Sequence, residues 1–497
     1  MRLKDLFEGI LIEVFWGSAE PEVQGITMDS RTVTDGELFV CLQGAYSDGH
    51  DYVEEALRKG AAAILACRED QVFRESLRRL LQQEEYQGRA VAFVKDTREA
   101  LAHVAANWYG HPARQLITIG ITGTKGKTTT SYMVRSILEN AGRRVGLIGT
   151  NEVIIGRRHM EAGNTTPESL ILQGYLREMV DAGLDTVVME VSSQAIKLKR
   201  TEGILFDYGV FTNLSPDHIA PAEHHDFQEY LECKRQLFRQ CRYGIINGDD
   251  SYAMAVTEGH TCVLETYGLG EDCLIRAENL EYKIQNEKLG VAFQVTGKMD
   301  FAAYLPLPGK FSVYNALAAI CICRHFRVRE SDVQRSLAAA RVKGRIETVE
   351  GTKGYTILID YAHNPMALQS LLETMREYRP GRLICLFGCG GNRPVMRRKR
   401  MGQISGKLAD LTVITDDNPR DEDPGVIREQ ILEGVMESGG EWVIVPDRRK
   451  AIQYCIENAR EGDLILLAGK GHEIFQEIRG KFYPMDEREI VRGILTK

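Results

Sequence analysis

A short glycine-rich segment that ends in lysine and threonine is the part of the sequence most able to do chemistry. It reads Thr122, Gly123, Thr124, Lys125, Gly126, Lys127 and Thr128. An apolar run precedes it and an amphipathic stretch follows, which predicts a strand, a loop and a helix. Glycines let backbone N–H groups close around phosphates, lysine reaches the terminal phosphates, and the threonine hydroxyl can hold Mg²⁺. The segment therefore predicts an ATP or GTP site; the alternative is a glycine-rich turn with a solvated lysine.

An acid and a histidine are predicted to lie beside this loop. Glu190 ends the apolar run 186–190, and His218 follows the run that ends at Thr212. The carboxyl ends of parallel strands meet at one sheet edge, so both side chains would reach the phosphates. Magnesium sites of this kind use few protein ligands together with water and phosphate oxygens. Each residue alone would be an ordinary surface acid or loop histidine, and their shared position predicts Mg²⁺ ligands.

The elements that must position these residues follow an alternating pattern. Apolar strand-like runs alternate with helical stretches through most of the chain, which predicts an α/β fold with parallel sheets. Between residues 274 and 306 the hydrophobic period becomes two, so we expect an antiparallel extension there. Composition and turn residues divide the chain into residues 1–112, 113–343 and 344–497, with a small α/β domain first and a Rossmann-like domain last. Asp360, Gly388, Asp417 and Gly469 follow strands of the last domain, where ligands of such sheets bind.

Composition restricts the class of protein. The 497 residues are 43% hydrophobic and 27% charged, and no apolar run approaches the roughly 20 residues of a membrane span. The amino terminus lacks a secretory signal pattern, so we expect a cytoplasmic protein. A net charge of −8 without long basic blocks argues against nucleic-acid binding. The eleven cysteines show no C-x-x-C spacing and are expected to be buried thiols, as at Cys41, Cys67, Cys241 and Cys455.

Six segments in this order resemble the Mur ligases. They begin at Thr122 (TGTKGKT), Glu190 (EVSS), Asn213 (NLSPDH), Asp360 (DYAH), Asp417 (DNPR) and Gly469 (GKGHE). The resemblance covers essentially the whole chain. It implies a monomeric, ATP- and Mg²⁺-dependent ligase that joins meso-2,6-diaminopimelate to UDP-N-acetylmuramoyl-L-alanyl-D-glutamate through an acyl phosphate, during peptidoglycan synthesis. The three domains would hold the UDP moiety, ATP and the incoming amino acid, and the last would close over the second to exclude water.

The same resemblance implies roles for individual residues. Uridine-nucleotide contacts would come from Met28, Ser30, Ala45, Tyr46 and Ser47. The muramoyl-dipeptide would contact Asn164, Thr165, Thr166, Ser192 and Arg200. Further nucleotide contacts would come from Asn315, Arg345, Asp360 and His363. The amino acid would contact Arg393, Asp417, Asn418, Pro419, Arg420, Gly469 and Glu473. The alternative is that these residues have structural roles, as hydroxyls that cap helices or turns and as side chains that pack at hinges.

Lys234 matches the position at which the family carries a carbamylated lysine. A carbamate turns the cation into an anion, which can hold magnesium where a free lysine would repel it. The alternative is a solvated lysine. Three positions depart from the family pattern, namely Gln194, Leu198 and Asn364, and they affect fine substrate contacts rather than the nucleotide and metal residues.

Diaminopimelate is preferred to L-lysine as the added amino acid because of Arg420. The two amino acids differ by a distal carboxylate, and an arginine can donate two parallel hydrogen bonds to such a group. Arg393 would be the second clamp. Ligation with L-lysine or another diamino acid, a folylpolyglutamate-type ligase, and an ATP-binding scaffold without ligation remain the alternatives. A folate ligase would lack the first domain, and a scaffold would be expected to have lost Lys127, Glu190 or His218.

Overall fold

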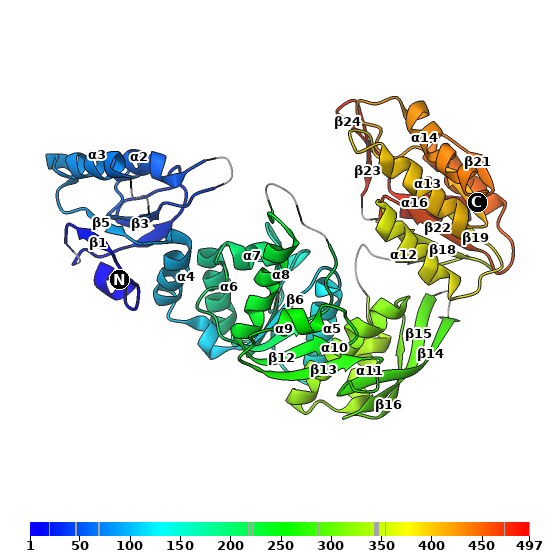
Figure 1. Ribbon diagram of the computed structural model, residues 1–497, viewed down its shortest axis with the longest axis horizontal. Coiled ribbons are helices and arrows are strands. Elements are labelled where there is room, and N and C mark those ends of the chain that lie inside the picture. The colour runs from blue at the N-terminus through cyan, green and yellow to red at the C-terminus, as the bar shows by residue number, and fades with distance from the viewer. Residues whose placement is uncertain are drawn as a thin grey trace. The chain divides into compact units, whose positions relative to one another are not determined.

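The structure is a computed structural model that describes residues 1–18, 20–44, 47–67, 70–216, 219, 223–285, 288–341, 347–352, 354–471 and 473–496. Its elements, labelled in Figure 1, divide into two compact units. The first unit contains residues 1–275 and 317–329, and the second contains residues 276–316 and 330–497. The division falls inside helix α10 (Lys310–Cys323).

A small sheet occupies the amino-terminal part of the first unit. Its strands lie in the order β1 (Val14–Trp16), β5 (Ala90–Phe93), β4 (Ala63–Ala66), β3 (Glu37–Val40) and β2 (Gly25–Thr27). All neighbours are parallel except β1 and β5. Side chains of α1 (Leu3–Leu6) and α4 (Thr97–Trp108) pack on one face, and those of α2 (Val53–Arg58) and α3 (Gln71–Leu81) pack on the other. The strands are short and buried because both faces are covered.

A second sheet carries the glycine-rich loop. Within the first unit its strands lie in the order β13 (Val263–Gly268), β12 (Cys241–Asn247), β11 (Phe206–Phe211), β6 (Ile117–Thr122), β10 (Thr186–Glu190), β7 (Val145–Ile148), β8 (Glu152–Ile155) and β9 (Arg158–Glu161). Neighbours from β13 to β7 are parallel, and β8 and β9 add antiparallel strands. The chain passes from β6 to β7 on one side and later to β11 on the other. Strand order therefore reverses at β6, the position where ligands of such sheets bind.

Helices of the first unit pack on this second sheet. They are α5 (Lys127–Asn140), α6 (Ser169–Asp181), α7 (Ser193–Lys197), α8 (Phe227–Gln236) and α9 (Ala253–Thr257). Helix α5 contacts β6, β7 and β10. Leu172 and Leu176 of α6 and Leu231 of α8 share one core cluster with side chains of β10 and β11. The loop that precedes α5 is thus fixed between a buried strand and a packed helix.

Antiparallel strands begin the second unit, as the period of two predicted. They are β14 (Ile275–Gln285), β15 (Lys288–Gly297) and β16 (Phe301–Leu305), and α11 (Glu330–Ala338) packs on β16. The Tyr378 hydroxyl donates to the Gly290 carbonyl oxygen at 3.1 Å, and its ring meets that of Tyr282 edge-on with centroids 5.4 Å apart. Leu289 joins the core of the carboxyl-terminal residues. These contacts make the antiparallel strands part of the second unit.

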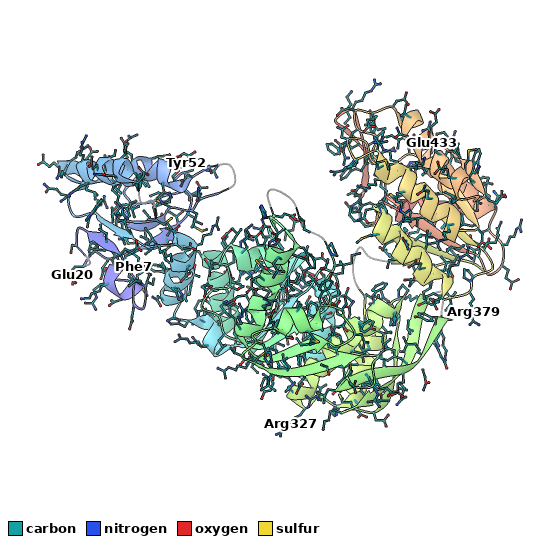
Figure 2. The ribbon with its side chains drawn as sticks, viewed as in Figure 1. Phe7, Glu20, Tyr52, Arg327, Arg379 and Glu433 are labelled. Carbon is teal, nitrogen blue, oxygen red and sulfur yellow. The ribbon has the colours of Figure 1, made fainter. Side chains whose placement is uncertain are left out.

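The third sheet has helices on both faces. Its strand order is β17 (Glu347–Val349), β18 (Thr356–Asp360), β22 (Leu464–Ala468), β19 (Leu383–Phe387), β20 (Leu411–Ile414) and β21 (Trp442–Ile444), and β17 alone among these strands is antiparallel. One face is covered by α12 (Pro365–Arg376), α13 (Met396–Leu408) and α14 (Pro424–Glu437), and the other by α15 (Arg448–Glu457) and α16 (Glu487–Leu495). A hairpin of β23 (Phe475–Ile478) and β24 (Lys481–Pro484) follows β22. Figure 2 adds the side chains, with Glu433 labelled on α14.

The predicted α/β fold with parallel sheets and an antiparallel extension is confirmed, whereas the hairpins β8–β9 and β23–β24 were not predicted. All eleven cysteines are free. Cys67 and Cys233, which were expected to be buried, are partly exposed, Cys67 because it follows the end of β4. Within the described ranges, no helix combines the length and apolar character needed to cross a membrane.

Candidate active site

The glycine-rich loop joins β6 to α5 through two glycines in left-handed conformations. Gly123 has φ +148° and Gly126, which caps α5, has φ +89°. A Cβ atom on Gly123 would lie 1.9 Å from the Thr212 hydroxyl oxygen, so no larger residue fits. Helix α5 begins at Lys127, which places the positive end of the helix dipole at the loop. The loop has the form of a phosphate cradle.

Neighbouring groups hold the loop in this form. The Lys127 ammonium donates to the carbonyl oxygens of Gly123 at 2.8 Å and Thr124 at 3.2 Å. Asn213, just after β11, accepts from the backbone N–H of Thr124 and of Lys125 at 2.8 and 2.9 Å. The loop is therefore shaped by its own lysine and by the adjacent strand end. A phosphate group would fit in this loop. The Lys127 ammonium would reach it by leaving the two carbonyl oxygens.

Glu190 lies at the loop, as its place at the end of β10 predicted. The carboxylate is buried and accepts from the hydroxyls of Thr128 at 3.1 Å and Thr150 at 3.0 Å. The backbone N–H of Thr150 adds a third hydrogen bond at 3.0 Å. A buried carboxylate beside a hydroxyl offers hard oxygen donors, which suit Mg²⁺. His218, the other predicted ligand, lies outside the described residues.

The residues expected to hold the muramoyl-dipeptide meet around the same strand end. Thr165 and Thr150 share a hydroxyl hydrogen bond of 3.0 Å. The Thr166 hydroxyl donates to the Glu190 carbonyl oxygen at 2.8 Å and accepts from the Ser192 backbone N–H at 3.1 Å. Arg200 donates through Nη1 to the Thr166 carbonyl oxygen at 3.0 Å. The structure thus brings Thr165, Thr166, Ser192 and Arg200 together, and Asn164 is their neighbour in sequence.

Glu168 fixes the direction of Arg200. Its carboxylate accepts from Nε and Nη2 of Arg200 at 2.9 and 2.6 Å. The other carboxylate oxygen accepts from Nη1 of Arg98, on α4, at 3.3 Å. This single acid, at the start of α6, therefore joins α4 to the end of α7. Arg200 is only 11% exposed, so the pair is well shielded from water.

Lys234 is buried in α8 near the glycine-rich loop. Its side chain is 1% exposed, and its Nζ lies 4.5 Å from the centre of the Tyr230 ring. The Tyr230 hydroxyl shares a hydrogen bond of 3.0 Å with the Thr124 hydroxyl. The alternative of a solvated lysine is therefore wrong. Its modification state stays a prediction.

The residues expected to contact the uridine nucleotide are only partly described. Ser30 is buried and donates to Glu55 at 3.4 Å, and Met28 packs against the core of the first sheet. Ser47 is exposed. Ala45 and Tyr46 lie outside the described residues. The assignment of this loop stays a prediction.

Some predicted nucleotide contacts belong to the second unit. Asn315, on α10, is buried. Asp360 ends β18 and accepts from the Ala362 N–H at 2.7 Å, and His363 Nδ1 lies 2.9 Å from the Tyr361 carbonyl oxygen. Arg345 lies outside the described residues. These four roles stay predictions.

The predicted amino-acid site is built around a lysine that sequence reasoning did not select. Lys470 is fully buried, and its ammonium lies 2.5 Å from Asn418 Oδ1, 3.1 Å from Asp417 Oδ1 and 3.2 Å from Glu473 Oε2. Asn418 also donates to Glu473 at 3.0 Å. Gly469 has φ +111° and brings its backbone close to Asp417. Three of the predicted residues therefore meet at one buried cation, and Gly469 lies beside one of them.

Two arginines lie near this cluster. Arg393 lies in the loop between β19 and α13, and Arg397 is the second residue of α13. Burial lowers the pKa of Arg397, and the neighbouring Arg393 lowers it further. The Arg397 Nε–H is buried without a hydrogen-bond partner among the described residues. A buried guanidinium N–H without a partner favours an anionic ligand.

Sequence reasoning missed Thr150, Glu168, Tyr230 and Lys470, and also Glu477, whose carboxylate accepts from Arg420 Nε at 2.9 Å. Thr150 follows β7, so the rule that ligands lie at carboxyl ends of strands could have found it. Lys470 stands inside the Gly469 segment that was already singled out. The other three act through contacts with residues distant in sequence, which no local pattern reveals.

Family models match nearly all of these regions. The Mur ligase family, catalytic domain, matches residues 22–109; the Mur ligase middle domain matches residues 121–323; and the Mur ligase, glutamate ligase domain, matches residues 344–471. The glycine-rich loop and Glu190 fall in the middle match, and Arg393 and Arg420 fall in the last.

Curated relatives and a solved structure span the full chain. A Caldanaerobacter subterraneus subsp. tengcongensis protein named UDP-N-acetylmuramoyl-L-alanyl-D-glutamate--2,6-diaminopimelate ligase is 40% identical, covering 100% of this chain and 99% of its own length. A Clostridium botulinum protein with that name is 39% identical, covering 96% of each chain. A solved structure titled with the same activity superposes with a TM-score of 0.77 at 26% identity, covering 100% of this chain and 99% of its own.

Proposed function

Because the chain belongs to the Mur ligase family, we propose that it is the ATP-dependent ligase that joins meso-2,6-diaminopimelate to UDP-N-acetylmuramoyl-L-alanyl-D-glutamate. The observation that carries the proposal is the full-length match to relatives of that name, which includes the amino-terminal sheet that a folate ligase would lack. We place the reaction in the cytoplasm, with the protein a monomer, and propose domains at residues 1–112, 113–343 and 344–497. The ligase makes a peptidoglycan precursor.

The glycine-rich loop would bind the nucleotide. When bound, ATP supplies the phosphoryl group that turns the D-glutamyl carboxylate into an acyl phosphate, and Mg²⁺ neutralises the charge. Lys127 would pair with the terminal phosphates, and Thr128, Glu190, His218 and carbamylated Lys234 would hold magnesium. The fit rests on two left-handed glycines and on oxygen donors at the loop. Asn315, Arg345, Asp360 and His363 are proposed further nucleotide contacts.

The muramoyl-dipeptide would lie along the segment that contains Thr165, Thr166 and Ser192. Arg200, held by Glu168, would orient the carboxylate of the dipeptide beside Glu190. Precise placement of a carboxylate near the phosphate site lowers the entropic part of the barrier. Met28, Ser30 and residues 45–47 would bind the uridine nucleotide.

The second unit would bind the amino acid. Asp417, Asn418 and Glu473 offer oxygen atoms to its ammonium groups, and Arg393 and Arg420 offer paired donors to its carboxylates. Lysine lacks the distal carboxylate, so Arg420 favours diaminopimelate. Pro419 and Gly469 shape the backbone of this site.

The proposal is tested with purified protein, ATP, Mg²⁺, the UDP-muramoyl-dipeptide and single amino acids, with the product weighed by mass spectrometry. A product heavier by the diaminopimelate residue is expected. Arg420→Ala should raise the KM for diaminopimelate about tenfold or more, since a bound carboxylate loses its charged partner. Arg460→Ala, an exposed arginine of the same unit, is the matched control. Equal or better use of L-lysine by the wild-type protein would contradict the choice of amino acid.

A further inference from the structure

The segment that carries Arg420 is bound along strand β23. The Gln476 side-chain amide donates to the Asp417 carbonyl oxygen at 2.6 Å, and the Glu477 N–H donates to Asn418 Oδ1 at 3.0 Å. The Arg420 N–H donates to the Glu477 carbonyl oxygen at 3.2 Å, and the Arg479 N–H donates to the Arg420 carbonyl oxygen at 2.8 Å. Arg420 thus forms an isolated parallel bridge with Ile478, although residues 417–420 form no strand themselves.

The Arg420 side chain is held at two points. Its Nε donates to Glu477 Oε2 at 2.9 Å, and its Nη1 donates to the Gly391 carbonyl oxygen at 2.7 Å. Both partners of the ion pair are 24% exposed, so solvent screens the pair only in part. A Cβ atom on Gly391 would lie 1.9 Å from the Pro419 carbonyl oxygen, which shows how closely the two loops approach.

These two contacts leave part of the guanidinium available. A guanidinium has five N–H donors in a fixed plane. Glu477 occupies the Nε donor and Gly391 occupies one Nη1 donor, while Nη2 has no partner among the described residues. The group is therefore fixed in direction, and the two N–H donors of Nη2 and the second N–H of Nη1 remain for a carboxylate.

We propose that Glu477 is a positioning residue that aims Arg420 at the distal carboxylate of the amino-acid substrate and so contributes to the choice between diamino acids. This inference rests on the function proposed above. Glu477 does not compete with the substrate, because it takes the Nε donor and leaves Nη2. A long arginine side chain without this partner would lose its fixed orientation and would have to be ordered by the substrate, which weakens binding.

Steady-state kinetics of the full chain test the proposal. Glu477→Ala should raise the KM for meso-diaminopimelate about tenfold, while kcat and the KM values for ATP and the UDP-muramoyl-dipeptide stay within about twofold. Glu477→Gln keeps an oxygen acceptor for Nε and should retain most of the wild-type KM. Utilisation of L-lysine at high concentration should be the same in the wild type and both variants, because lysine has no distal carboxylate to be read.

Glu437→Ala is the matched control, since it removes the acid of an ion pair with Lys399 in the same unit. If Glu477→Ala does not fold, Glu477→Asp, which keeps the charge but shortens the reach, should raise the same KM. The proposal is overturned if the alanine variant is unchanged, if diaminopimelate and lysine are affected alike, or if glutamine loses as much as alanine. A wild-type protein that makes no diaminopimelate product refutes the proposed function itself, whereas an active wild type with an unaffected Glu477→Ala refutes only the role of Glu477.

Discussion

At the scale of single residues, the two candidate sites use buried charges whose partners are already in place. The Glu190 carboxylate accepts three hydrogen bonds, and the Lys470 ammonium lies among three side-chain oxygen atoms. Buried charges of this kind are costly unless they are paired, so each constrains its neighbours strongly. Single substitutions at these positions should therefore have large effects on ligation.

Replacement of Lys127 by alanine is expected to abolish ligation and leave the protein folded. The ammonium that would neutralise the transferring phosphoryl group is lost, which corresponds to several kcal/mol, or roughly 10²–10³-fold or more in kcat. A phosphate-release assay and circular dichroism together test this. Lys298→Ala, at an exposed position outside both sites, serves as the control. Near-normal ligation by a folded Lys127→Ala protein would rule out the nucleotide assignment.

Lys234 is expected to carry a carbamate in the active protein. An unmodified ammonium buried to 1% exposure near a magnesium site would be repelled by the metal, whereas a carbamate supplies anionic oxygen ligands. Carbon-13 NMR with labelled bicarbonate should show the adduct without exposing it to acid. Lys234→Ala should be inactive and partly restored by short carboxylic acids. An unmodified Lys234 in fully active protein would contradict this.

At the scale of elements, helix starts and strand ends carry the candidate sites, and much of this was readable from the sequence. The alternation of apolar runs predicted β6, β10 and β22 and hence the edge on which Glu190 lies. The hairpin β23–β24 was missed because its strands are short and partly or fully exposed, so no period-two pattern marks them. Glu477 could not be predicted, since its importance depends on pairing with a segment 57 residues away.

Glu168, at the start of α6, should act on substrate binding through Arg200. Glu168 uses one carboxylate oxygen for Arg200 and the other for Arg98, and Glu168→Gln replaces one of these acceptors by an amide NH₂ group. One of the two arginines then loses its partner, so the KM for the UDP-muramoyl-dipeptide should rise several-fold. The KM for ATP should stay unchanged. Glu178→Gln on the same helix breaks the surface pair with Arg158 and provides the comparison. An unchanged dipeptide KM in Glu168→Gln would show that Arg200 needs no such support.

At the scale of the whole molecule, the chain consists of two compact units, and the antiparallel strands β15 and β16 belong to the second. The hydrogen bond from the Tyr378 hydroxyl to the Gly290 carbonyl oxygen is one of the contacts that join β15 to the rest of the second unit. Chains with more than one compact unit commonly unfold in more than one step. The effect of a substitution on the free energy of unfolding can then be assigned to one unit.

Calorimetry should resolve this division. Tyr378→Phe leaves the Gly290 carbonyl oxygen without its donor and should destabilise the second unit by about 1 kcal/mol, which lowers one transition and not the other. Tyr304→Phe is a matched control in the same unit, because its buried hydroxyl has no hydrogen-bond partner among the described residues. A single transition shifted as a whole by Tyr378→Phe would show that the units unfold together.

The backbone of Arg420 has a consequence for how this position can evolve. Its φ of +52° lies in the left-handed region, which costs a residue with a Cβ atom about 1 kcal/mol relative to glycine. Mutation to glycine would relax the chain at this point, but it would also remove the hydrogen bonds from Arg420 to Glu477 and to the Gly391 carbonyl oxygen, which offset that cost. A lineage that changed its amino-acid building block would therefore have to change Glu477 along with Arg420, because loss of the arginine alone leaves that acid without its partner.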